Sequence, residues 1–121
     1  LDITDPLLAA RCGNIKFFSA TYRLFNIDAL ESDCEDYGQA VIYRGTIAES
    51  PHRFVLDKHH DIQTGRVFTV CGNTWRMLHD TRLAQHFEFI GDFSRHYGIF
   101  EGCGVALPFS VDALSEGAPC C

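Results

Sequence analysis

The stretch FFSATYRLF, from Phe17 to Phe25, decides the fold, because it is the longest β-prone run in the chain. It is bounded by Gly13-Asn14 before it and by an acidic, turn-rich segment after it. Side chains alternate between the two faces of a strand. We therefore expect a central strand over residues 15–25, with one face packed on the core: Phe18, Ala20, Tyr22 and Leu24.

The opposite face of this predicted strand has a polar centre, made of Ser19, Thr21 and Arg23. Two interpretations are open. These side chains could line a cleft, or the face could be half exposed with Arg23 paired to an acid, and we favour the second.

Length and composition indicate one globular domain. The chain has 121 residues, of which 46% are hydrophobic, and this is enough for a core of its own. The net charge of -6 and the lack of a basic stripe argue against partners that are nucleic acids or anionic membranes. No apolar run is long enough for a membrane helix, and the start does not resemble a signal peptide. Because residue 1 is leucine, we expect the sequence to be part of a longer protein.

The first 13 residues predict a short helix. Thr4 or Asp5 can cap its start, Pro6 suits its first turn and Gly13 can end it. Its apolar residues are expected to pack on the rest of the domain: Leu7, Leu8 and Ala10.

The remaining pattern predicts a mostly antiparallel α+β fold of about five strands with two or three short helices. After an acidic loop at 26–38, strands are expected at 39–47, 52–57 and 66–71, and with the strand at 15–25 they should form an antiparallel meander. A helix capped by Asn73 should then precede a last strand at 87–91. Gly45 indicates a bulge or a close backbone approach. The predicted domain covers residues 1–100, and a flexible, cysteine-containing tail covers 101–121.

Six cysteines, at positions 12, 34, 71, 103, 120 and 121, do not form a CxxC motif. With no signal peptide, we expect reduced thiols and a cytoplasmic protein rather than a disulfide framework. Cys71 should be a small buried residue at the end of a strand. Cys34 lies in the acidic loop, where neighbouring carboxylates should raise the pKa of its thiol.

The adjacent pair Cys120-Cys121 is the sharpest chemical feature of the sequence. Two neighbouring thiolates can chelate one thiophilic ion, such as Cu(I), Zn(II) or trivalent arsenic. Cys103, on the same tail, could supply a third sulfur. The alternative is a set of tail cysteines that are idle or oxidised between molecules.

A second candidate is the run His59-His60 with Asp57 and Asp61 beside it. These residue types can bind metals, but they fall in a predicted hairpin turn, where adjacent side chains diverge. We favour a solvated turn. No nucleophile elbow, P-loop, metalloprotease or dinucleotide motif is present.

Six stretches together resemble a known family. In chain order they are FSATYRLF at 18–25, VIYRGTI at 41–47, residues 57–65, VCGNT at 70–74, TRLAQHF at 81–87 and HYG at 96–98. The combination resembles the C-terminal domain of S-adenosylmethionine-dependent arsenite methyltransferases over about residues 5–100. Members of that family often end in adjacent cysteines, as this chain does.

The resemblance implies an accessory role in arsenic detoxification. In that family, S-adenosylmethionine and the catalytic cysteines lie in a preceding Rossmann-like methyltransferase domain, and the enzyme uses a thiol reductant. No catalytic or cofactor-binding residue is therefore assigned here. We expect this segment, without catalysis of its own, to dock on the upstream domain and to capture As(III) through Cys120, Cys121 and Cys103. The alternatives are a structural or regulatory interaction domain with no ligand, or a free-standing thiophilic-ion carrier.

Overall fold

The computed structural model describes residues 3–13, 15 and 18–102 of the chain. These residues form an α+β fold in which every pair of named strands is antiparallel, as predicted. The elements are α1 (Pro6–Cys12), β1 (Glu35–Asp36), β2 (Gln39–Tyr43), β3 (Arg53–Val55), β4 (Asp61–Gln63), β5 (Val67–Val70), α2 (Gly72–His79), the 3-10 helix η1 (Ala84–His86), β6 (Phe87–Ile90) and β7 (Gly98–Ile99).

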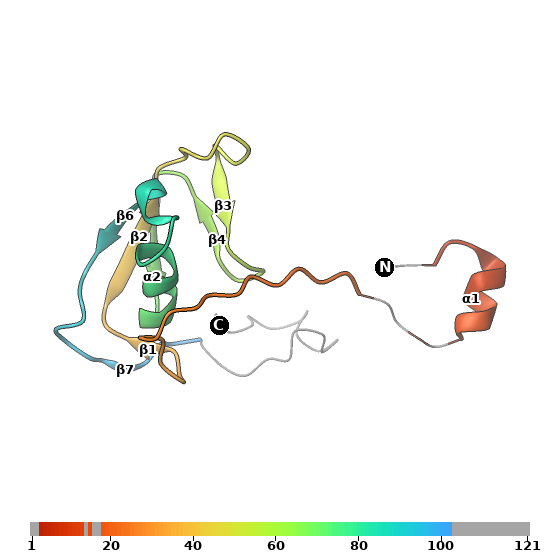
Figure 1. Ribbon diagram of the computed structural model, residues 1–121, viewed down its shortest axis with the longest axis horizontal. Helices are drawn as coiled ribbons and strands as arrows, with labels where there is room; N and C mark the ends of the chain where they lie inside the picture. The colour runs from red at the N-terminus through yellow and green to blue at the C-terminus, as the bar shows by residue number, and fades with distance from the viewer. Residues whose placement is uncertain (1–2, 14, 16–17, 103–121) are drawn as a thin grey trace.

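The central sheet has the strand order β5-β2-β6, with α2 packed against it (Figure 1). β2 reads QAVIY, a nearly continuous apolar run, because it lies in the middle of the sheet and is buried on both faces. Val41 stands opposite Phe68 of β5 and Phe89 of β6. The predicted simple meander is therefore wrong in its order, although the predicted strands near 39–47, 66–71 and 87–91 are confirmed.

The hairpin β3–β4 packs beside the central sheet and closes the core. Its Phe54 ring lies 5.7 Å from the ring of Tyr43 and 5.4 Å from that of Phe87, between centroids. The predicted strand at 52–57 is confirmed as β3, whereas β4 occupies a segment that we expected to be a turn. The core residues are Val41, Tyr43, Phe54, Leu56, Ile62, Val70, Leu78 and Phe87.

The helix α1 has the predicted ends but not the predicted packing. The Asp5 carboxylate accepts hydrogen bonds from the backbone N–H groups of Leu7 and Leu8, and Gly13 caps the other end. Leu7 and Leu8 are nevertheless 78% and 53% exposed, and α1 stands apart from the body of the domain (Figure 1). No described helix is long and apolar enough to cross a membrane.

The predicted strand at 15–25 is wrong over its described residues. Residues 18–25 are extended but belong to no sheet, and they run outside the body between α1 and β1 (Figure 1). Of the supposed core face, Phe18, Tyr22 and Leu24 are 53%, 70% and 92% exposed, and Ala20 is exposed as well. β-propensity expresses fit to neighbouring strands, and the central strand β2 is already paired on both edges, by β5 and β6.

Candidate functional site

The predicted As(III) ligands lie outside the described residues. Cys103, Cys120 and Cys121 all belong to the segment 103–121, so capture by the tail stays a prediction. Within the part of the chain that the structure describes, no group of three or more His, Cys, Asp or Glu residues could hold a metal ion. The sequence run around His59 and His60 therefore does not form a metal site there.

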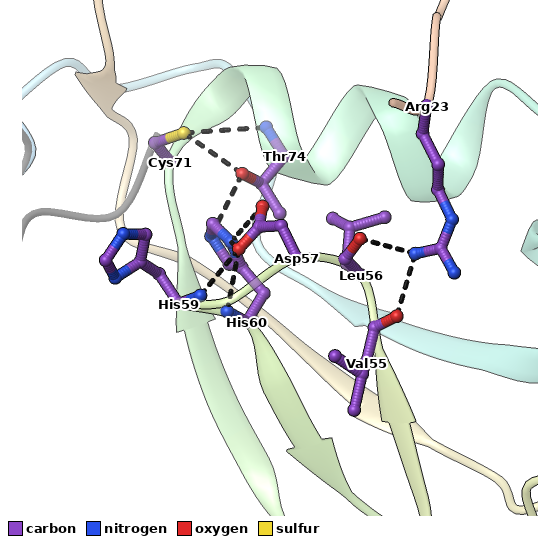
Figure 2. Close-up of polar contacts among 8 residues, drawn as sticks. All are labelled: Arg23, Val55, Leu56, Asp57, His59, His60, Cys71 and Thr74. Atoms are coloured by element: carbon purple, nitrogen blue, oxygen red, sulfur yellow. Dashed lines mark hydrogen bonds and ion pairs between the residues drawn. The ribbon is translucent and has the colours of Figure 1, made fainter. Parts of the chain in front are cut away.

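The turn between β3 and β4 instead builds a polar pair. His60 Nδ1 lies 2.9 and 2.8 Å from the two carboxylate oxygens of Asp57, and the backbone N–H groups of His59 and His60 also donate to that carboxylate (Figure 2). His60 is 2% exposed, so our prediction of a solvated turn is wrong at this residue. A buried imidazole requires partners, and Asp57 supplies one of them.

Further hydrogen bonds connect the Asp57–His60 pair to the start of α2. His60 Nε2 lies 3.4 Å from the hydroxyl of Thr74, and that hydroxyl lies 3.4 Å from the sulfur of Cys71 (Figure 2). Cys71, rather than the predicted Asn73, is the N-cap of α2, and its sulfur accepts from the backbone N–H of Thr74. Asn73 instead bonds the backbone N–H and carbonyl of Glu31.

The burial of its members determines whether this series of hydrogen bonds could act in catalysis. A neutral imidazole with its proton on Nδ1, beside Asp57, would accept at Nε2 from the Thr74 hydroxyl, and the oxygen of that hydroxyl would then accept from the Cys71 thiol. The order carboxylate, imidazole, hydroxyl resembles a nucleophilic triad. However, Cys71 is 0% and Thr74 2% exposed, so a substrate cannot reach either atom. This series of hydrogen bonds joins the β3–β4 turn to α2, and its role is structural. The prediction that Cys71 is buried is confirmed.

The electrostatics of the turn follow from the same contacts. Partial burial raises the pKa of Asp57, but hydrogen bonds from His60 and from the backbone N–H groups outweigh it and lower that pKa from 3.8 to about 2. Because the pKa in the folded state is depressed, the stabilisation is complete above about pH 4 and is lost as the pH falls towards 2.

We therefore expect Asp57→Asn to weaken the acid dependence of stability. Near neutral pH the variant should lose about 1 kcal/mol of unfolding free energy, since the carboxylate is about half exposed. Between pH 4 and pH 2 the wild type should lose stability more steeply than the variant. Urea unfolding of both proteins at several pH values measures the two slopes, and equal slopes would contradict this account of the turn.

Arg23 connects the extended segment to this turn. Its guanidinium donates to the carbonyl oxygens of Val55, at 2.7 Å, and of Leu56 (Figure 2). The same guanidinium lies over the Phe54 ring. We favoured a pairing of Arg23 with an acid, but among the described residues its partners are these carbonyls. Backbone carbonyl groups leave no pattern in a sequence, which is why the contact was not predicted.

An open groove of about 830 Å³ lies between residues 23–27 and residues 80–86. Its walls include Phe25, Ile47 and Leu83, with Arg23 and His86 among its polar lining. Of the polar residues that could have lined a cleft, Ser19, Thr21 and Arg23, only Arg23 is part of this groove.

The two remaining described cysteines also differ from each other. Cys12 is the last residue of α1 and is partly exposed. Cys34 is disulfide-bonded, so our predictions of a reduced thiol and of a raised pKa are wrong at this position.

The fold and these contacts define an α+β domain in which three members of the described network, His60, Thr74 and Cys71, are buried. The family model for the arsenite methyltransferase C-terminal domain matches residues 37–107, which include all three strands of the central sheet and α2. This chain therefore belongs to the arsenite methyltransferase C-terminal domain family.

Two further comparisons agree with this assignment. The chain is 64% identical over all of its 121 residues to the arsenite methyltransferase of Aquipseudomonas alcaligenes, of which it covers 35%, in the C-terminal part. It is also similar to the crystal structure of an arsenic(III) S-adenosylmethionine methyltransferase from Chlamydomonas reinhardtii, with a TM-score of 0.72 and 42% identity over 84% of this chain and 34% of that one. The chain thus spans about a third of the length of these relatives.

Proposed function

We propose that this chain is the accessory domain of an enzyme that methylates trivalent arsenic with S-adenosylmethionine, and that it serves arsenic detoxification. The observation that carries the proposal is the family match over residues 37–107, together with the identity to an arsenite methyltransferase. The upstream part of such an enzyme would bind S-adenosylmethionine and carry out methyl transfer, with a thiol reductant as co-reactant. The burial of His60, Thr74 and Cys71 supports a non-catalytic role for this network.

The proposed contribution of this segment has two parts. The domain docks on the upstream methyltransferase domain, and Cys120, Cys121 and Cys103 bind As(III) and pass it on. Soft thiolates are suitable ligands for trivalent arsenic. A tethered ligand set also raises the local concentration of arsenic near a neighbouring site.

Titration of As(III) into the 121-residue chain tests the capture step. With a phosphine reductant present, we expect Cys120→Ser/Cys121→Ser to weaken binding at least about tenfold, because the variant loses two of three sulfur ligands. Cys12→Ser, which removes a partly exposed thiol on α1, is the matched control and should bind as the wild type does. Equal affinity of the double variant and the wild type would remove the tail from the mechanism.

The second candidate is a structural or regulatory domain with no ligand of its own. The exposed side chains of Tyr22 and Leu24 favour it, because exposed apolar groups often mark a surface that binds another part of a protein. If As(III) does not bind, but removal of the domain lowers the stability or activity of a full-length enzyme, this candidate replaces the first.

A further inference from the structure

The disulfide of Cys34 links this residue to a cysteine outside the described part of the chain. Of the described cysteines, Cys12 and Cys71 are thiols, whereas Cys34 is disulfide-bonded. The sequence has six cysteines, so three candidates for the partner remain, all within residues 103–121: Cys103, Cys120 and Cys121. The backbone around Cys34 favours one of them.

The chain that leads to Cys103 runs directly beside Cys34. β1 pairs with β7 in an antiparallel register that places Glu35 opposite Ile99 (Figure 1). One residue further, the backbone N–H of Phe100 donates to the carbonyl oxygen of Cys34, at 2.8 Å. The Cα atoms of two residues opposed in this way lie about 5.5 Å apart. Cys34 is thus held next to a residue that precedes Cys103 by only three positions.

A turn at Glu101 and Gly102 follows at once. Gly102 has a φ of +85°, which glycine adopts without steric cost and which some β-turns require at their third residue. A β-turn brings the residues on its two sides to within about 7 Å between Cα atoms, and a disulfide needs Cα atoms about 4.4–6.8 Å apart. Cys103 is the residue after this turn, so it has the position in the sequence that a partner of Cys34 needs.

We propose that Cys34 and Cys103 form a reducible disulfide, which keeps Cys103 out of the As(III) ligand set until a thiol reductant opens it. This inference rests on the proposed function and adds a redox control to its capture step. The thiolate is the form of cysteine that binds metals, and a sulfur in a disulfide has none to offer. The oxidised chain therefore keeps two tail sulfurs for arsenic, and reduction supplies the third.

The reduction is a two-electron thiol–disulfide exchange with a dithiol. One thiolate of the dithiol attacks a sulfur of the disulfide, forms a mixed disulfide and releases one cysteine. The second thiol displaces the other cysteine and closes the oxidised reductant, and the two protons of the dithiol pass to the two cysteines. Three thiols then replace the three hydroxyl groups of arsenous acid, so that three As–S bonds form and three water molecules leave. Cys34 is partly exposed, which lets a small reductant approach.

Peptide mapping tests the pairing. The 121-residue chain is equilibrated with oxidised glutathione, alkylated at mildly acidic pH to suppress exchange, and cut after glutamate, because Glu116 separates Cys103 from the terminal pair. We expect a linked product that joins residues 32–35 to residues 102–116, in the wild type and in the control Cys12→Ser. A link from residues 32–35 to residues 117–121 would overturn the proposal. So would a Cys34 that is alkylated or joined to glutathione.

As(III) titration tests the control of capture. We expect the oxidised chain to bind As(III) at least about tenfold more weakly than the chain reduced with a phosphine, since the oxidised chain lacks one sulfur ligand. A phosphine is used because a dithiol would itself bind As(III). Cys34→Ser, when reduced, should bind As(III) as the reduced wild type does. A tenfold loss in this variant would make Cys34 a ligand itself and would overturn the proposal.

The outcome is distinguishable from that of the proposed function. Absence of As(III) binding by the reduced chain refutes the proposed capture, whatever the mapping shows. Equally tight binding by the oxidised and the reduced chain supports the capture and overturns its redox control.

Discussion

Replacement of His60 with alanine is expected to lower the free energy of unfolding by about 2–4 kcal/mol. His60 is 2% exposed and fills part of the space between the β3–β4 turn and α2. Its loss would leave a cavity, deprive the Asp57 carboxylate of its imidazole donor and leave the buried hydroxyl of Thr74 without its imidazole partner.

His59→Ala is the matched control for this prediction. His59 is adjacent in sequence and more exposed, and its contact with Asp57 comes from the backbone N–H, which alanine retains. We expect its effect to stay within about 0.5 kcal/mol. Urea unfolding of both variants near neutral pH measures the difference. If His59→Ala and His60→Ala destabilised equally, the hydrogen-bond chain to α2 would not be the reason that His60 is buried.

The local ends of elements could be predicted from the sequence, because their causes are local. Asp5, Pro6 and Gly13 act through a side-chain cap, a fixed φ and a positive φ, and the helix they predicted is α1. Apolar runs likewise predicted β2 and β6, since these strands provide much of the core.

The failures concern partners that are distant in the chain. The segment 18–25 reads as a strand, but propensity does not state which strand lies beside it, and no strand does among the described residues. His60 looked like a solvated turn residue because its second partner, Thr74, is 14 positions away. A capping role for Cys71 was missed because Asn73 is the more usual N-cap type.

For the candidate site too, some features could be predicted from the sequence and others depended on distant partners. The family resemblance of the SATYRLF segment was confirmed, yet in this structure that segment is an exposed connector and not the core strand of the domain. The Arg23 contacts and the exposure of Tyr22 and Leu24 could not be predicted from the sequence. The thiol chemistry at Cys120 and Cys121 rests on sequence alone and is left to the As(III) titration.

Gly45→Ala is expected to destabilise the domain by about 2–5 kcal/mol, from a strained backbone and a steric clash together. Gly45 follows β2 and has a φ of +71°, which a side chain disfavours. A Cβ at this position would lie 2.6 Å from the backbone carbonyl oxygen of Pro51 and 2.8 Å from Cγ2 of Thr64. A backbone oxygen cannot rotate away, so the loop before β3 would have to shift. This contact is the close backbone approach that Gly45 predicted in the sequence.

Gly65→Ala separates the two causes. Gly65 has a φ of +75°, close to that of Gly45, but a Cβ there would meet no atom within 4 Å. We therefore expect only the backbone penalty of about 1–2 kcal/mol for Gly65→Ala. The difference between the two variants, measured by urea unfolding under one set of conditions, isolates the contact with Pro51 and Thr64. Equal losses would mean that the loop yields to the added methyl group, and that β2 and β3 are less tightly coupled through this turn than their contacts imply.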